Sequence, residues 1–269
     1  MKRKLKYTIC LFVGIVIVLP LLYAMMASFM APAELAQYPP RFLPETLRLE
    51  NYQNALKALP MFTFLRNSFV VCFIVISAQV ITCSLAAYAF SFFQFKGRNF
   101  LFMTVLATMM VPAEATIISN FLTISQWKLT DSYLGLVLPF LTSAMGIFLM
   151  RQFYLTVPFE LKEASVIDGC SDMRFLFGIL VPLSTPTIAA LGVYVFINTY
   201  NQFLWPLLVT NRMDMRTIQI GMSMLREAEA VRYEIVLSGA VLVLIPSVFV
   251  FVVGQNYLVK GMTAGAVKG

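Results

Sequence analysis

The sequence offers few of the residue types that carry out catalysis. It contains no histidine, which is the commonest general base and metal ligand. It has no glycine-rich phosphate loop of the form Gly-x-x-x-x-Gly-Lys-Ser/Thr. The cysteines are scattered, and no two have the spacing of metal ligands: they are Cys10, Cys72, Cys83 and Cys170. We therefore expect no catalytic residues, no metal site and no cofactor held by this chain itself.

The polar segment 156–172 carries clear signals for a short helix. Pro158 suits the first helical position, because its missing N–H would have no partner there. Gly169 stands where a left-handed C-terminal cap is needed, and Ser171 can cap a second helix that follows. These signals predict a helix over 158–168, about 16 Å long at 1.5 Å per residue.

One face of this helix has small residues at its centre. Leu161, Ala164, Ser165 and Asp168 follow three- and four-residue spacing, so another protein surface could approach closely. Lipid headgroups are the alternative neighbour, but helices that lie on membranes usually carry a strongly basic face. This helix has two glutamates and an aspartate against a single lysine. The charge pattern favours a protein partner.

Polar side chains within an apolar run are the second candidate site. Asn198, Asn201, Gln202 and Trp205 fall on about one face at helical spacing. Amides and an aromatic ring would suit a hydroxyl-rich solute, and hydrogen bonding to neighbouring helices is an equally good interpretation. Glu114 is the carboxylate within an apolar run. It marks either a helix break at a pore or the outer end of a helix, and the structural interpretation is slightly favoured.

Composition indicates the elements that must position these residues. The chain is 59% hydrophobic and 12% charged, with a mean hydropathy of +0.81, whereas soluble domains have about a quarter of their residues charged. Most of the surface must therefore face lipid. The net charge of +7 does not indicate nucleic-acid binding, because the basic residues stand at the ends of apolar runs, away from any aromatic-rich basic stripe.

Six apolar runs are long enough to cross a bilayer as helices. The first could be a signal peptide, but its apolar part is too long and ends without a small-residue cleavage site. We predict an all-α polytopic membrane protein with one domain over 1–269. Prolines inside the runs are tolerated where neighbouring helices satisfy the freed carbonyls. The predicted spans are 7–30, 68–93, 100–125, 133–154, 179–209 and 235–259.

Charge predicts the orientation. Four basic residues precede the first run and none follows it immediately, which places the N-terminus in the cytoplasm. An even number of spans puts the tail 260–269 on the same side, in a bacterial inner membrane. The outer segments would be 31–66, with a short helix near 49–59, and 211–234. They would serve equally well as a docking surface or as connecting loops.

A family resemblance rests on the segment after the fourth run. Glu163-Ala164-Ser165, then Gly169, then Ile179 with Val181-Pro182 resembles the EAA signature of binding-protein-dependent ABC importer permeases. Ser165 stands in place of the second alanine and Val181 in place of leucine, and the spacing matches throughout. The resemblance implies the type I importer fold. It also implies that an ATP-binding subunit is contacted through the segment that holds Glu163, Ala164, Ser165, Asp168, Gly169 and Pro182.

Two further stretches resemble carbohydrate permeases. The tail 260–269 looks like that of the smaller maltose-type permease, which implies contacts between the nucleotide-binding subunits through Gly261, Thr263, Gly265 and Lys268. The stretch 200–208 looks like glycerol-3-phosphate permeases, so the exact solute stays open. The implied partners are a second homologous permease, two ATP-binding subunits that hold ATP and magnesium, and an external solute-binding protein.

Two other classes of membrane protein fit the sequence less well. An ion-coupled secondary transporter would need carboxylates within its spans, where only Glu114 qualifies, and would normally be longer with inverted repeats. A membrane enzyme would need a nucleophile–base pair or metal cluster, and the sequence has no histidine. The sequence therefore favours the permease of an importer.

Overall fold

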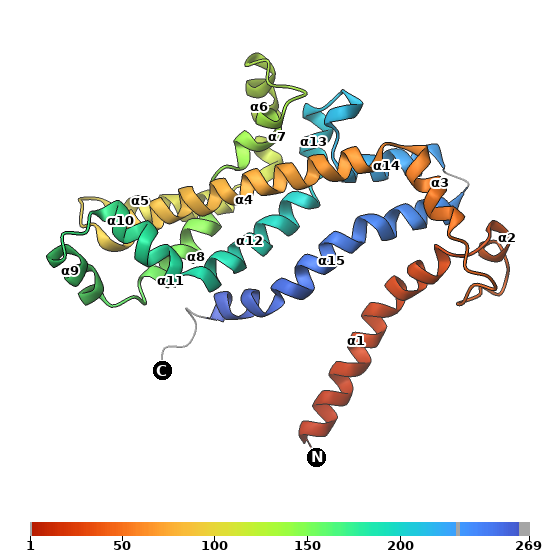
Figure 1. Ribbon diagram of the computed structural model, residues 1–269, viewed down its shortest axis with the longest axis horizontal. Coiled ribbons are helices and arrows are strands. Elements are labelled where there is room, and N and C mark those ends of the chain that lie inside the picture. The colour runs from red at the N-terminus through yellow and green to blue at the C-terminus, as the bar shows by residue number, and fades with distance from the viewer. Residues whose placement is uncertain (1, 230–231, 264–269) are drawn as a thin grey trace. The chain divides into compact units, whose positions relative to one another are not determined.

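The computed structural model describes residues 2–229 and 232–263, and their regular structure is entirely helical. Three helices are long and apolar enough to cross a membrane: α1 (Lys2–Ala27), α4 (Met61–Phe92) and α15 (Tyr233–Thr263). This confirms the predicted all-α, polytopic fold class. The remaining helices are shorter, and several of them pair across sharp bends (Figure 1).

The three bent pairs would bring the number of spans to six if each pair is one span. The first joins α5 (Arg98–Ala107) and η1 (Thr108–Met110) to α6 (Ala113–Gln126), with a bend of 95°. The second joins α7 (Tyr133–Val137) and η2 (Leu138–Phe140) to α8 (Ala144–Tyr154), bent by 51°. The third joins α10 (Asp172–Phe175), η3 (Leu176–Leu180) and α11 (Val181–Leu183) to α12 (Thr185–Tyr200), bent by 78°.

Each bend has a local cause. At the first, Pro112 lacks an N–H and disfavours the helical conformation of the residue before it, so Val111 is extended (φ −82°, ψ 118°). At the second, Ser143 is extended and starts α8 by accepting the N–H of Gly146 (3.1 Å). At the third, Pro182 follows the five-residue π-helix η3, and the turn to α12 comes at Ser184.

The fifth predicted span differs most from the structure. A straight helix over 179–209 is absent: the helical path begins at Asp172, bends before α12, and α12 ends at Tyr200. A separate short helix, α13 (Leu204–Val209), follows. The apolar run is continuous in sequence, but its prolines interrupt the backbone hydrogen bonds.

Contacts within the chain divide it into two compact units, where the sequence predicts a single domain. The first holds residues 1–64 and 218–246, and the second holds residues 65–217 and 247–269. The first unit contains α1, α2 (Pro32–Leu35), α3 (Glu50–Ala58), α14 (Ile218–Ala228) and the start of α15. The short outer helix predicted near 49–59 is thus present as α3.

Buried polar contacts connect the first unit. The Asn51 side-chain amide, 5% exposed, donates to the carbonyls of Ser28 and Met30, both at 2.9 Å. Ser238 Oγ of α15 donates to the same Ser28 carbonyl at 2.9 Å. The start of α3 and α15 are therefore joined at backbone carbonyls of the residues that directly follow α1.

Glu34 organises the loop that follows α1. It is 9% exposed, and its carboxylate accepts the backbone N–H groups of Ala31 (2.6 Å) and Glu45 (2.7 Å). These two hydrogen bonds hold the pKa of the Glu34 carboxyl below its ordinary value of 4.5, and the bond from Ala31 N–H has the larger effect. A carboxyl group whose pKa is lower in the folded chain stabilises the fold at pH values above its pKa in the unfolded chain. This stabilisation is lost as the pH falls through its pKa in the folded chain.

We therefore expect the segment 31–48 to loosen below pH 4.5, the ordinary pKa of a glutamate. Hydrogen–deuterium exchange, corrected for the intrinsic pH dependence of amide exchange, should show lower protection at acidic pH than at pH 7. The variant Glu34→Gln should lose this pH dependence. Equal protection of the wild-type segment at both pH values would contradict the role of the carboxylate.

The second unit surrounds a core between α4, α8 and α12. Fully buried side chains from these helices and from α10 meet there, among them Tyr88, Met150, Tyr154, Phe175 and Leu191. At the C-terminal end of α4 lie α9 (Phe159–Ile167) and α10, whereas α6, α7 and α13 gather closer to its middle (Figure 1). The predicted functional segments therefore fall into two separate groups.

Candidate functional site

The loop helix α9 begins and ends where the sequence signals it should, within one residue. Pro158 is the N-cap, one position earlier than predicted, and the helix runs from Phe159 to Ile167. Gly169 has φ 73°, the left-handed conformation expected of it, and its N–H donates to Val166 O at 3.0 Å. Ser171 Oγ accepts the N–H of Arg174 at 3.4 Å and so caps α10.

The outer surface of α9 differs from the predicted small-residue face. Ser165 is 5% exposed, and its hydroxyl donates to Lys162 O at 2.7 Å, so this residue faces its own chain. Glu163, Ala164, Asp168 and Gly169 are exposed. The prediction that Ser165 lies on the open face is corrected: three- and four-residue spacing does not say which side of a helix the rest of the chain covers.

Large apolar side chains share that open surface. Ile167 is 85% exposed and Val166 57%, with Phe159 and Leu161 also exposed. Exposed apolar side chains gathered on a short polar loop indicate a surface that another protein covers. Together with the exposed Glu163 carboxylate, they form a mixed apolar and acidic surface.

Pro182 lies apart from that surface. It is exposed in α11, between the π-helix η3 and the bend at Ser184. Because proline cannot donate a backbone hydrogen bond, it sets the path from α10 to α12. The structure thus separates Pro182 from the other residues of the signature.

The second group of predicted residues surrounds a cavity of about 520 Å³. Residues beside the first two bends and at the end of α12 line it, so the cavity lies where helices are interrupted. Backbone that leaves the helix at membrane depth is tolerated where it lines such a cavity. Its polar side chains include Gln79, Thr108, Thr142, Ser143, Asn198 and Gln202.

A neighbouring cavity of about 360 Å³ shares Ala113, Pro139, Phe140 and Gln202 with the first. Its lining adds Glu114, Asn120 and Trp205. Glu114 is in the first turn of α6, directly after the break at Pro112, where the helix dipole favours a negative charge. Glu114 therefore follows a break within the first bent pair of helical segments, over 98–126, and lies beside a cavity, in line with the first of its two interpretations.

The predicted face of the fifth span is only partly brought together. Asn198 and Gln202 line the larger cavity, and Gln202 and Trp205 line the smaller. Asn201 lines neither, and its amide donates to Ile197 O at 2.8 Å. Trp205 is 4% exposed, and its Nε1 donates to Leu136 O at 3.2 Å, so the helix-to-helix interpretation fits this residue. Because α12 ends at Tyr200 and α13 begins at Leu204, the four predicted residues do not share one helix face.

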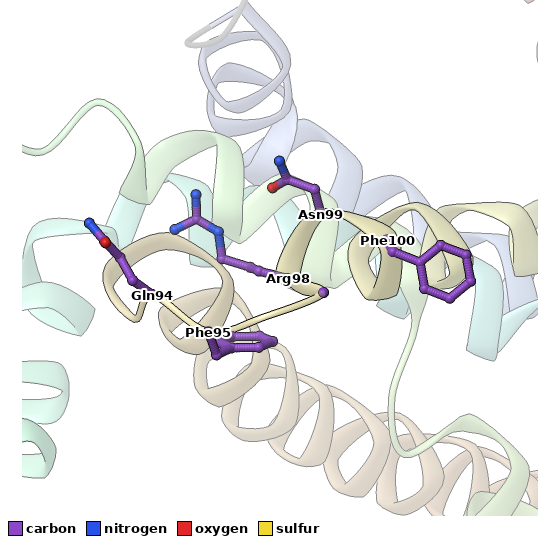
Figure 2. Close-up of a pocket in the computed structure, with 6 residues that line it drawn as sticks. Gln94, Phe95, Arg98, Asn99 and Phe100 are labelled. Carbon is purple, nitrogen blue, oxygen red and sulfur yellow. The ribbon is translucent and has the colours of Figure 1, made fainter.

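A third cavity, of about 470 Å³, is formed by the loop between α4 and α5. Figure 2 shows Gln94, Phe95, Arg98, Asn99 and Phe100 around it. Gly97 turns this loop with φ 83°, and Arg98 donates to Phe93 O at 3.1 Å. One short segment supplies the whole lining, and none of the predicted site residues belongs to it.

Comparison with known proteins decides the family. A family model described as "Binding-protein-dependent transport system inner membrane component" matches residues 79–264. The chain belongs to this family. The resemblance drawn from the EAA signature is confirmed, and the chain is a membrane-spanning permease of the ABC sugar-importer family.

Relatives of the permease match along nearly its whole length. The arabinooligosaccharides transport system permease protein AraQ of Halalkalibacterium halodurans is 33% identical over 261 residues, covering 96% of this chain and 94% of the relative. The sn-glycerol-3-phosphate transport system permease protein UgpE of Brucella melitensis biotype 1 is 39% identical over 262 residues, covering 94% and 93%.

A solved structure supports the fold. A chain in the crystal structure of a bacterial ABC transporter involved in the import of the acidic polysaccharide alginate matches with a TM-score of 0.83. The two share 21% sequence identity, and the match covers 94% of the permease and 95% of that chain. At this identity the likeness concerns the fold alone.

Sequence reasoning missed the residues of the permease that support its broken helices. Gln79 donates from Nε2 to Phe140 O and accepts from Ser143 Oγ, both at 2.8 Å, and Thr82 donates to Leu141 O at 2.8 Å. These side chains of α4 satisfy backbone groups that the bend between η2 and α8 leaves free. The sequence offered one signal for these residues: they are polar side chains in one span, at about the same depth as a proline in another span.

The predicted tail contacts of the permease fall at the edge of the described residues. Gly265 and Lys268 lie outside them. Gly261 and Thr263 belong to the last turns of α15 by backbone, and their side chains are not described. Within the described ranges, no group of three or more cysteine, aspartate or glutamate side chains could hold a metal ion.

Proposed function

We propose that the permease forms one half of the membrane pathway of an ATP-driven importer. It would pair with a second, homologous permease, two ATP-binding subunits that hold ATP and magnesium, and an external solute-binding protein. Both of its termini and α9 would face the cytoplasm. The observation that supports this most directly is the exposed surface of α9, where Glu163 stands among open apolar side chains on an otherwise polar loop.

The course of the chain supports a mechanical role for α9. The helix is placed between α8 and α10, and α10 continues through the bend at Ser184 into α12. The end of α12 carries Asn198 and is followed by Gln202, both of which line the larger cavity. Movement of α9 with an ATP-binding subunit would therefore reach the cavity through one continuous path, as alternating access requires.

The lining of the two neighbouring cavities of about 520 and 360 Å³ supports neutral sugars as the solute class. Among the described residues that line these two cavities there is no lysine or arginine, and Glu114 is the single charged side chain. Phosphate esters are recognised by arginine or lysine, whereas amide and hydroxyl groups match the hydroxyls of sugars. We therefore place the solute closer to the sugar oligomers named for AraQ than to the glycerol phosphate named for UgpE.

Reconstitution of the complex tests this function. The permease should co-purify with an ATP-binding subunit, and vesicles that contain the complex and the binding protein should take up neutral oligosaccharides only when ATP is supplied. Uptake driven by an ion gradient without ATP would instead support a secondary transporter with Glu114 as the coupling group. Uptake of glycerol 3-phosphate in preference to sugars would overturn the proposed solute class.

Gln202 offers a sharper test, because it lines both cavities. We expect Gln202→Leu to lower sugar uptake about tenfold, since one lost hydrogen bond costs about 1 kcal/mol and the amide can make more than one. Asn201→Leu is the matched control, because Asn201 is the adjacent amide and lines neither cavity. Initial uptake rates at saturating ATP would be compared. Equal rates in the two variants would contradict a role for Gln202.

A further inference from the structure

Lys162 lies on α9 next to Glu163 but points into the protein. Its side chain is 11% exposed, and its Nζ lies 2.5 Å from Asp172 Oδ1, at the start of α10. The ammonium also lies 4.9 Å from the centre of the Phe175 ring, a favourable position for a cation. One turn of α9 thus carries an exposed carboxylate, that of Glu163, and a largely buried ammonium group, that of Lys162.

The same carboxylate oxygen reaches a third helix. Tyr88, on α4 and 1% exposed, donates its hydroxyl to Asp172 Oδ1 at 2.8 Å. A single oxygen atom therefore connects α9, α10 and α4. Hydrogen bonds to charged groups are shorter and stronger than neutral ones. The Lys162 and Tyr88 side chains lie largely inside the protein, whereas the Asp172 side chain that they share is 47% exposed.

Aromatic rings surround this contact. Phe175 of α10 packs against Tyr88 with ring centres 6.2 Å apart, and Phe92 near the end of α4 stacks on Phe159 of α9 at 6.2 Å. Without these contacts α9 would be joined to the membrane helices only through the short connections 155–158 and 168–171. Such connections would absorb a displacement of α9 and pass little of it on.

We infer that Lys162, Asp172 and Tyr88 form a joint that makes α9, α10 and the end of α4 move as one body. They are positioning residues: Glu163 meets the ATP-binding subunit, and the joint carries its displacement to the membrane helices. This inference rests on the proposed function. It adds that transport efficiency depends on a contact within the permease, as well as on the contact between subunits.

The test is the number of ATP molecules hydrolysed per solute imported by the reconstituted complex. Lys162→Met keeps the apolar stem and removes the charge, and we expect it to co-purify with the ATP-binding subunit. The ratio should rise about fivefold or more, because the charge-assisted bond to Asp172 and the cation contact with the Phe175 ring are lost. Tyr88→Phe removes one hydroxyl and should raise the ratio about twofold. Lys96→Met, an exposed lysine of the loop after α4, is the matched control and should leave the ratio unchanged.

Charge exchange separates the joint from a general loss of stability. Lys162→Asp and Asp172→Lys should each raise the ratio, and the double variant should bring it back toward that of the wild type. A wild-type ratio in Lys162→Met, or a double variant no better than the single ones, would overturn the joint. Failure of the wild-type permease to co-purify with any ATP-binding subunit would instead overturn the proposed function.

Discussion

Glu163→Lys is expected to reduce ATP-dependent solute uptake more than tenfold while the permease still inserts into the membrane. The carboxylate is exposed on α9, and within the described residues it has no ion-pair partner, so the substitution should cost the chain itself little stability. In the proposed complex, the positive charge of the new lysine would face a surface of the ATP-binding subunit that is suited to a carboxylate. Removing one partner of a buried charge pair costs about 2–5 kcal/mol, which is tenfold or more in affinity.

Vesicle uptake and ATP hydrolysis, measured on the same preparation, check this expectation. Glu227→Lys is the matched control, because Glu227 is an exposed glutamate of α14, which the sequence places on the outer side. It should leave uptake within twofold of the wild-type value. Unchanged uptake in Glu163→Lys would remove Glu163 from the contact with the ATP-binding subunit.

Gly135→Ala is expected to be the most destabilising small change in the second unit. An added Cβ would lie 2.2 Å from Leu129 O, a backbone atom. That carbonyl is held in place, because Ser132 Oγ donates to it at 2.6 Å while accepting the N–H of Gly135 at 3.1 Å. Relief of the clash requires the backbone between α6 and α7 to move, at a cost of about 2–4 kcal/mol.

Thermal unfolding of the purified permease in detergent checks this second expectation. A loss of that size should lower the melting temperature by about 5 °C or more. Sugar uptake should fall as well, because α7 leads directly into the Pro139-Phe140 segment that lines both cavities. Gly178→Ala is the control, since an added Cβ there meets no atom within 4 Å. Equal melting temperatures for the two variants would contradict the clash.

Local signals in the sequence determined a large part of the functional assignment. Proline, glycine and serine act on their own backbone or that of close neighbours, so Pro158, Gly169 and Ser171 predicted the limits of α9 within a residue and the cap of α10. The spaced signature around Glu163 indicated the family, which the comparisons confirm. Apolar runs indicated membrane helices, because a run of that length has few other stable environments.

The tertiary structure alone decided how these elements are bent and which sides they present. A hydrophobic run has the same composition whether its helix is straight or broken, so the bends of 95°, 51° and 78° could not be predicted from it. The cavity beside the first two bends joins residues as distant in sequence as Gln79 and Gln202. Helical spacing could not show that the Lys162 and Ser165 side chains point into the protein, because this depends on where α4 and α10 pack against α9. The sequence determined what acts within a few residues, and long-range packing decided the rest.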